Sequence, residues 1–136
     1  MSCQFFVYGT LKRGLRNESV WPRAPLSVQV AWTRGLLYGG PHYPAMKPGH
    51  DRVRGELWTF DCDQCEAVTK SLDVLEGTNN NSPGDLYHRS IAEVFDLHGQ
   101  SLGQANLYHY ARDPLDHGFK KLQPQDDNYV DWPAAD

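Results

Sequence analysis

The chain has 136 residues, 40% of them hydrophobic and 22% charged, and its formal net charge is −4. This length suits one small domain with a single core, and the acidic balance argues against nucleic acid or an anionic membrane as a partner. No apolar run approaches the ~18 residues that a membrane helix needs, and the first residues have the pattern of a strand instead of a secretion signal. We therefore expect a cytoplasmic monomer.

In chain order, the pattern predicts a mostly β domain with one clear helix. Strands are expected at residues 4–8, 27–38, 53–60, 87–97 and 104–110, and a helix near 63–76. Gly35 is expected to mark a bulge or bend, and residues 39–51, rich in Gly, Pro and His, a loop. About five to six strands with one helix predict an α+β fold with a curled, barrel-like sheet.

The end of the chain differs from the rest in composition. Residues 111–136 are polar and are interrupted by Pro114, Pro124 and Pro133, which break any helix. We expect residues 1–110 to form the domain and residues 111–136 to form an extended or poorly ordered tail.

The first strand ends in an abrupt change of character. The apolar run Phe5–Tyr8 stops at Gly9 and passes into the polar and basic segment Thr10–Gly14. Glycine permits a tight turn and lets a ligand approach the backbone, and successive N–H groups in such a turn can bind an anion. Taken alone, the stretch is more simply interpreted as an ordinary turn at the end of a strand.

The predicted helix ends at Glu76, before Gly77. An apolar stripe at helical spacing leads up to it, formed by Cys65, Val68, Leu72 and Leu75. Gly77 follows the last turn, where a left-handed residue is often needed. The helix dipole and the apolar neighbours would both raise the pKa of Glu76, which makes a carboxylate a better general base. The alternative is a solvated glutamate beside a helix cap.

The cysteines and histidines do not suggest a metal site. Cys3, Cys62 and Cys65 are an odd number and a poor disulfide framework. Cys62 and Cys65 form a C-x-x-C pair without a second pair, so free thiols in an intracellular protein are favoured over a zinc or redox site. The six histidines are scattered without ligand-like spacing.

Several stretches recur together in one known family. They are Phe6–Gly14 with Asn17, Tyr43-Pro44, Val53–Trp58, Leu72–Gly77, Tyr87–Arg89 and Ala105–Tyr110. Each motif is weak, but the ordered set is specific, and over roughly residues 3–110 the chain resembles the γ-glutamylcyclotransferase-like proteins. The Tyr8–Gly14 stretch most resembles the γ-glutamylamine cyclotransferases and the plant avirulence-induced proteins. Residues 79–84 look longer than the family usually carries there.

The resemblance implies a fold and a reaction. The fold is a small mixed β-barrel with a helix beside its mouth. The reaction cleaves a γ-glutamyl amide without water or cofactor: the substrate's α-amine attacks its own γ-carbonyl, giving 5-oxoproline and a free amine or amino acid. Glu76 aligns with the family's catalytic glutamate. The substrate-binding residues implied or expected are Tyr8, Gly9, Thr10 and Leu11 in the anion-binding loop, and Tyr43, Tyr87 and Tyr110 in the pocket wall.

Alternatives remain open at this stage. Glu56 is a rival carboxylate, although its place inside a strand favours a structural role. Tyr87 and Tyr110 fit core packing equally well. Arg89 could hold Glu76 or the substrate carboxylate, although an exposed strand arginine is the default interpretation. A γ-glutamylamine is the favoured substrate. The runner-up function is a small-molecule-binding module that has lost useful turnover.

Overall fold

The computed structural model describes residues 2–79 and 81–133. Its elements are β1 (Ser2–Val7), η1 (Glu18–Val20), β2 (Ser27–Gly39), β3 (Pro44–Asp61), η2 (Cys62–Gln64), α1 (Cys65–Glu76), β4 (Tyr87–Phe95), β5 (Ser101–Tyr110), η3 (Pro114–His117), β6 (Lys120–Lys121) and β7 (Tyr129–Val130). Within these described ranges, no helix is long and apolar enough to cross a membrane.

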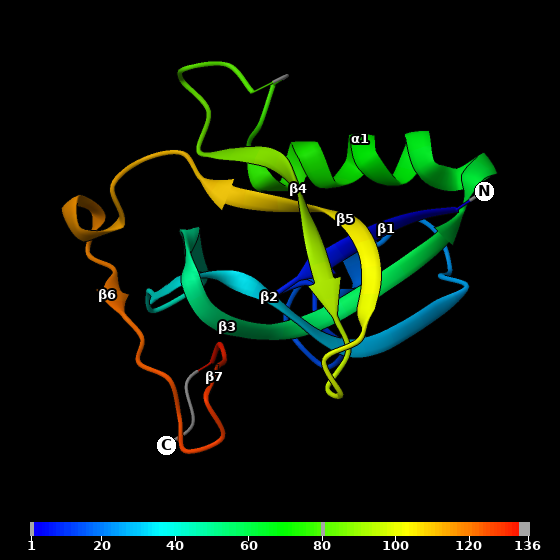
Figure 1. Cartoon of the computed structure of the whole chain (residues 1–136). Helices are drawn as coiled ribbons and strands as arrows, with labels where there is room; N and C mark the ends of the chain where they lie inside the picture. Colours follow the sequence, from blue (N-terminus) through cyan, green and yellow to red (C-terminus); the bar gives the residue numbers. More distant parts are fainter. Residues whose placement is uncertain (1, 80, 134–136) are drawn as a thin grey trace.

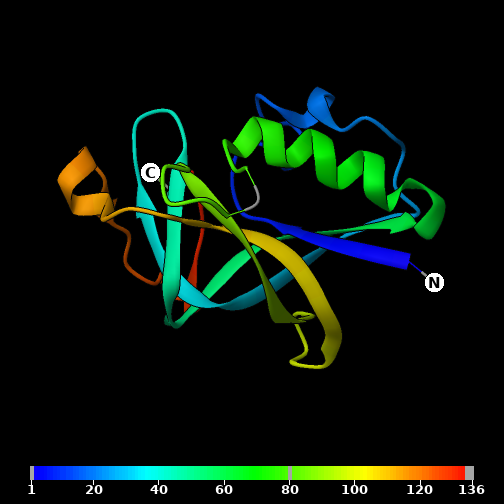
Figure 2. The same cartoon turned by 90° about the horizontal axis from the view of Figure 1, so that it is seen from above.

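The strands form one mixed sheet that curls back on itself. Their order is β6-β2-β4-β5-β1-β3-β7, and an additional pairing of β2 with β3 joins β2, β4, β5, β1 and β3 into a ring. The β1–β5 and β3–β7 pairs are parallel, and the other pairs are antiparallel. Helix α1 lies along one side of this sheet (Figures 1 and 2). The predicted α+β class, a curled sheet with one main helix, is confirmed.

Strand β1 is buried on both faces. Phe5 and Val7 pack in one cluster with Val68 and Leu72 of α1, whereas Phe6 and Tyr8 belong to a second cluster on the other face. This alternation follows from the two-residue period of a strand. Because both faces are packed, β1 is a rigid support for the loop that follows it.

The expectation of a loop over residues 39–51 is wrong for most of that range, because β3 already begins at Pro44. Gly35 pairs with Asp51 and Leu36 with Lys47, so residues 48–50 have no partner on β2 and form a bulge. The irregularity predicted at Gly35 is thereby confirmed. Strands β2 and β3 form one long hairpin, in which β2 matches the strand expected at residues 27–38 and β3 extends well beyond the strand expected at residues 53–60.

The segment after Tyr110, for which the sequence favours an extended or poorly ordered tail, contains η3 and two short strands that pair with the sheet. Strand β6 pairs with β2, and β7 pairs with β3. Phe119 and Val130 are buried in the two core clusters. Arg54 of β3 forms ion pairs with Asp127 and Asp131.

A disulfide joins Cys3 near the start of β1 to Cys65 at the start of α1, with the two Cα atoms 5.9 Å apart. The interpretation of all three cysteines as free thiols is therefore wrong for this pair. Cys62 alone is a free, exposed thiol. The pairing arises because β1 runs alongside β3, with Cys3 opposite Phe60, and α1 begins only five residues after Phe60.

Candidate active site

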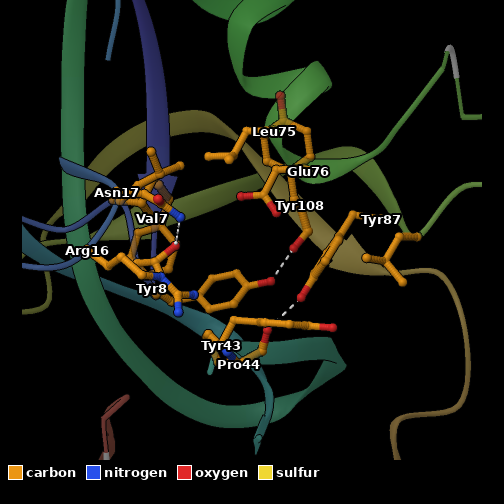
Figure 3. A pocket seen from close by; sticks show the side chains of 15 residues that line it. Val7, Tyr8, Arg16, Asn17, Tyr43, Pro44, Leu75, Glu76, Tyr87 and Tyr108 are labelled. Carbon is orange, nitrogen blue, oxygen red and sulfur yellow. Dashed lines mark hydrogen bonds between the residues drawn. The ribbon is translucent and has the colours of Figure 1, made fainter. Parts of the chain in front are cut away.

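A cavity of about 170 Å³ opens between the end of β1, the loop after it, the start of β3 and the end of α1 (Figure 3). The residues that line it are Phe6, Val7, Tyr8, Gly9, Thr10, Leu11, Arg16, Asn17, Tyr43, Pro44, Leu75, Glu76, Leu86, Tyr87 and Tyr108. Arg16, Tyr43 and Leu75 are exposed and mark the mouth, whereas the other lining residues are buried or half-buried. The size suits a small molecule.

Glu76 reaches the cavity from the last turn of α1, and Figure 3 shows its carboxylate pointing inward. The helix stops there because Gly77 is left-handed, with φ 70°, and Thr78 N–H then donates to Asp73 O at 3.0 Å. No described residue donates a hydrogen bond to the Glu76 carboxylate. Burial raises its pKa from an ordinary value near 4.5 to about 7. The group can therefore both accept and return a proton near neutral pH.

Asp73, one turn before Glu76, ties the end of α1 to the sheet. Its Oδ1 accepts hydrogen bonds from the Tyr108 hydroxyl on β5 at 2.5 Å and from Arg89 Nε on β4 at 3.1 Å. Bonds to a charged group are among the stronger side-chain contacts. Arg89 is thus a partner of Asp73, which lies three residues before Glu76, and not of Glu76 itself. The network fixes the turn from which Glu76 projects.

The loop after β1 is tightly folded by its own bonds. Lys12 N–H donates to Gly9 O at 3.1 Å, and Asn17 donates to Thr10 O from its backbone N–H at 2.8 Å and to Thr10 Oγ1 from Nδ2 at 2.9 Å. No acceptor among the described residues takes the N–H groups of Gly9, Thr10 or Leu11. Free, fixed N–H groups of this kind can hold an anion.

Gly9 also lets the start of β3 approach the loop. A Cβ atom at this position would lie 2.8 Å from both Cγ and Cδ of Pro44. Because a proline ring cannot rotate away, any larger residue would push the loop or the strand. Tyr43-Pro44 and the loop at Gly9 therefore line the cavity in close contact with each other.

The tyrosines divide into wall and core. The Tyr8 hydroxyl donates to Tyr108 O at 2.5 Å, and the Tyr87 hydroxyl donates to Pro44 O at 2.7 Å. Burial, together with the charge of Glu76, raises the pKa of both phenols, so they are neutral and serve as fixed walls. Tyr43 is at the mouth. Tyr110 does not line the cavity; its ring packs against Tyr87 and Phe119.

Tyr108 and Arg16 are among the lining side chains that sequence reasoning did not assign to the site. Tyr108 lies two residues before Tyr110, on the same face of β5, so the period of the strand made either tyrosine a candidate. Arg16 had no such signal, because it lies in an irregular segment between β1 and η1.

The rival carboxylate Glu56 is held elsewhere. It accepts hydrogen bonds from Arg13 N at 2.8 Å, Arg13 Nε at 2.9 Å and Trp58 Nε1 at 3.2 Å. It does not line the cavity. Its observed contacts are structural and fasten the loop after β1 to β3.

Comparison with known proteins places this arrangement in a family. Residues 5–133, nearly the whole chain, match the model of the family described as "Gamma-glutamyl cyclotransferase, AIG2-like". The chain belongs to this family. It is 29% identical over 123 residues to the "Gamma-glutamylcyclotransferase family protein YtfP" of Escherichia coli K12, covering 90% of this chain and 94% of that protein. It is 32% identical over 107 residues to the "Gamma-L-glutamyl-butirosin B gamma-glutamyl cyclotransferase" of Niallia circulans, covering 76% of this chain and 65% of that protein.

Solved structures show the same fold. The crystal structure of an AIG2-like protein from mouse matches with a TM-score of 0.63 and 27% identity, covering 84% of this chain and 81% of that one. The solution structure of ytfP from Escherichia coli matches with a TM-score of 0.55 and 28% identity, covering 95% of both chains. The predicted family resemblance is confirmed, and residues 111–133 lie within the matched range.

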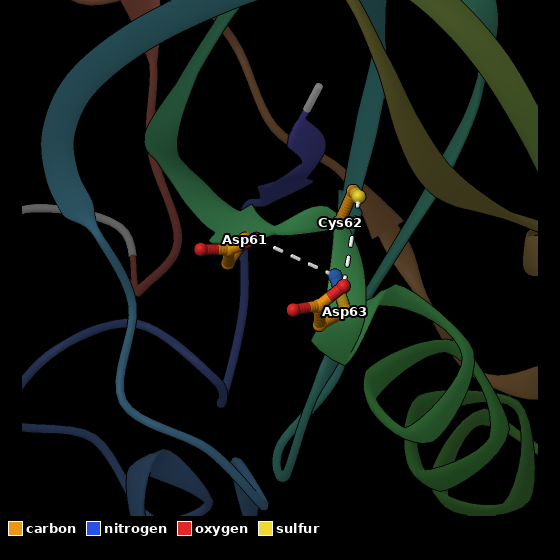
Figure 4. Close-up of side chains that lie close together, drawn as sticks. All are labelled: Asp61, Cys62 and Asp63. Atoms are coloured by element: carbon orange, nitrogen blue, oxygen red, sulfur yellow. Dashed lines mark hydrogen bonds between the residues drawn. The ribbon is translucent and has the colours of Figure 1, made fainter.

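One group of side chains in this cyclotransferase-family protein has metal-ligand chemistry. Asp61, Cys62 and Asp63 offer ligand atoms within 4.8 Å of one another, and all three are exposed (Figure 4). They lie where β3 passes into η2, before α1, while Glu76 is at the other end of that helix. Asp61 accepts a hydrogen bond from Asp63 N, as the cap of η2. The cavity itself has no histidine or cysteine among its described lining residues.

Proposed function

We propose that this protein is a cyclotransferase that cleaves a γ-glutamyl amide into 5-oxoproline and a free amine or amino acid, with Glu76 as the proton carrier. The observation that carries the proposal is the pairing of two features in one cavity. Glu76 is a carboxylate without a hydrogen-bond partner among the described residues, with a pKa raised to about 7 by burial. The loop with Gly9, Thr10 and Leu11 lines the same cavity, and the N–H groups of these residues have no acceptor in the described chain.

The substrate's α-carboxylate would bind these loop N–H groups, whose fixed dipoles reorganise little. The Glu76 carboxylate then takes a proton from the α-ammonium group, and the freed amine attacks the γ-carbonyl carbon to form the new C–N bond. Glu76 returns that proton to the amide nitrogen as the old C–N bond breaks. After ring closure the attacking nitrogen still has one proton more than a lactam N–H; Glu76 takes this second proton and passes it to the released amine, which leaves as an ammonium ion. Atoms and charge then balance, and Glu76 ends as a carboxylate. The remaining wall residues, Tyr8, Tyr43 and Tyr87, would hold the glutamyl chain in a folded conformer suited to ring closure.

The enzyme would need no cofactor and no metal, since an intramolecular amine and one carboxylate suffice. We also propose that it acts as a cytoplasmic monomer. A γ-glutamylamine is the substrate that the Tyr8–Gly14 stretch favours. Tyr110 would act through packing behind Tyr87 instead of by substrate contact.

The test distinguishes cyclotransfer from hydrolysis by blocking the substrate's α-amine. The protein is incubated with a γ-glutamyl alkylamide and with its N-acetylated analogue, and 5-oxoproline, glutamate and amine are measured. We expect 5-oxoproline from the first compound only, because acetylation removes the nucleophile and leaves the amide bond unchanged. Release of glutamate would indicate a hydrolase. Binding without any product would favour the module that has lost turnover.

A substitution of Glu76 tests its role as the proton carrier. Glu76→Gln should fold and still bind 5-oxoproline but lose about 10²–10⁴-fold in turnover, the usual scale for a general acid–base group. Glu66→Gln is the control, because Glu66 is an exposed residue in the first turn of the same helix. Near-normal turnover in a folded Glu76→Gln variant would remove Glu76 from the mechanism.

A further inference from the structure

Arg16 is a cationic side chain at the mouth of the cavity with most of its hydrogen-bonding capacity unused. Its Nη2 donates to His42 O at 2.7 Å, which holds the guanidinium on the side of the cavity where Tyr43 lies (Figure 3). A guanidinium has five N–H donors. No other hydrogen bond from the Arg16 side chain, and no ion pair with it, occurs within the described residues.

The charges around the cavity make Arg16 distinctive. Of the described residues that line it, Glu76 is the one acid and Arg16 the one base. The nearest acid along the chain, Glu18, accepts a hydrogen bond from Gly14 N–H and forms no ion pair with Arg16. A free guanidinium fork at a cavity mouth matches a carboxylate in geometry and charge.

The proposed reaction decides which part of a substrate meets this group. Ring closure needs the α-amine and the γ-carbonyl beside Glu76, and the α-carboxylate has its own partners in the N–H groups of the Gly9 loop. The inner walls are buried core side chains such as Phe6 and Tyr108. The leaving group must therefore point outward, past Arg16, Tyr43 and Leu75.

We propose that Arg16 is a specificity-determining residue that selects substrates by the charge of their leaving group. It favours leaving groups that bear a carboxylate, as in an amino acid, over neutral alkylamines, and it disfavours cationic diamines. This inference rests on the proposed cyclotransferase function. It predicts that γ-glutamyl amino acids are better substrates than the γ-glutamylamines that the sequence favours.

The test uses three substrates that differ almost only in charge: γ-glutamylglycine, γ-glutamylglycinamide and the γ-glutamyl amide of ethylenediamine. For the wild type, kcat/KM for 5-oxoproline release should fall in that order, with about tenfold between the first two, a value between those typical of exposed ion pairs and of charged hydrogen bonds. Arg16→Gln should lower the value for γ-glutamylglycine about tenfold and leave γ-glutamylglycinamide nearly unchanged. Arg16→Lys should keep part of the preference, and Arg16→Glu should favour the cationic substrate.

Arg23→Gln is the matched control, because it removes the same charge from an exposed arginine whose described hydrogen bond is to the adjacent Pro22 O. It should leave all three values unchanged. An equal loss on all three substrates in Arg16→Gln would mean that Arg16 holds the α-carboxylate or the rim, and no loss would mean that it is a bystander. Either result overturns the proposal.

Failure of the proposed function would look different. If the wild type releases no 5-oxoproline from any of the three, the dissociation constants of γ-glutamylglycine and γ-glutamylglycinamide for the wild type and Arg16→Gln still decide the role of Arg16. A preference for the carboxylate that disappears in the variant supports it. Equal affinities, or no measurable binding, overturn it.

Discussion

At the residue scale, burial of Glu76 has opposite consequences for activity and stability. As the proton acceptor, Glu76 must be ionised, and its pKa is about 7 instead of the ordinary value near 4.5. We therefore expect kcat/KM to rise with pH through about 7 and to level off above it. Rate measurements across pH 5–9 with a γ-glutamyl amide check this, and Glu66→Gln should retain the same profile.

Stability should change in the other direction. Between pH values near 4.5 and about 7, the folded protein keeps a proton on Glu76 that the unfolded chain has already lost. The stabilising contribution is thus full below the unfolded pKa and disappears as pH rises through the folded pKa. Relative to Glu76→Gln, the wild type should lose free energy of unfolding across this range in urea titrations. If the free energy of unfolding has the same pH dependence in both proteins, Glu76 is not buried enough for its pKa to be raised.

At the element scale, what matters is how the loop after β1 fits the start of β3. In Gly9→Ala, the new methyl group would lie 2.8 Å from the ring of Pro44, so the loop or the strand must shift. Displacement of binding groups by about 1 Å can cost about 10²-fold in rate. We expect kcat/KM to fall by about that factor while the protein stays folded.

The control for this prediction is Gly84→Ala. A Cβ atom at Gly84 would meet nothing within 4 Å, and its φ lies outside the left-handed region. Activity should be unchanged. Full activity in Gly9→Ala, with a normal Gly84→Ala, would exclude close contact between the loop and Pro44 as a requirement of the site.

The same elements show what sequence patterns could and could not predict. Strand β1 and the end of α1 have strong local signals, an apolar run and an apolar stripe followed by Gly77, and both were located within a few residues. The first part of β3 was missed because Pro44, Pro48 and Gly49 suggest a loop. Pro44 is the first residue of the strand, and Pro48 and Gly49 lie in the bulge, where no ladder hydrogen bond is lost.

At the scale of the whole molecule, the site depends on contacts between distant parts of the chain. The loop after β1, the start of β3 and the end of α1 come together only because β1 pairs with β3 and α1 packs on β1. Family motifs located Glu76 and the Gly9 loop in advance. Arg16 could not be found this way because it lies in an irregular segment, and the Asp73–Tyr108 bond could not because it depends on how α1 and β5, distant in the sequence, pack in the fold.

The Cys3–Cys65 disulfide also joins distant parts of the chain, so the sequence did not predict it. Its effect should be measurable in the free energy of unfolding. It spans 62 residues of sequence. By the chain-entropy model, closing a loop of that size in the unfolded state stabilises the fold by about 4 kcal/mol, with engineered cases often lower. Cys3→Ser should therefore lower the free energy of unfolding by up to about 4 kcal/mol, and added reductant should lower the wild type to the same level.

Activity should respond much less than stability to this change. The disulfide holds the first residue of α1, whereas Glu76 is eleven residues along, about 16 Å at the helical rise. The folded Cys3→Ser variant should thus keep most of its turnover at 25 °C and lose it on mild heating before the wild type does. Cys62→Ser is the control, since Cys62 is exposed and unbonded, and it should unfold like the wild type. If oxidised wild type and Cys3→Ser unfold at the same urea concentration, the bond does not stabilise the folded protein in solution.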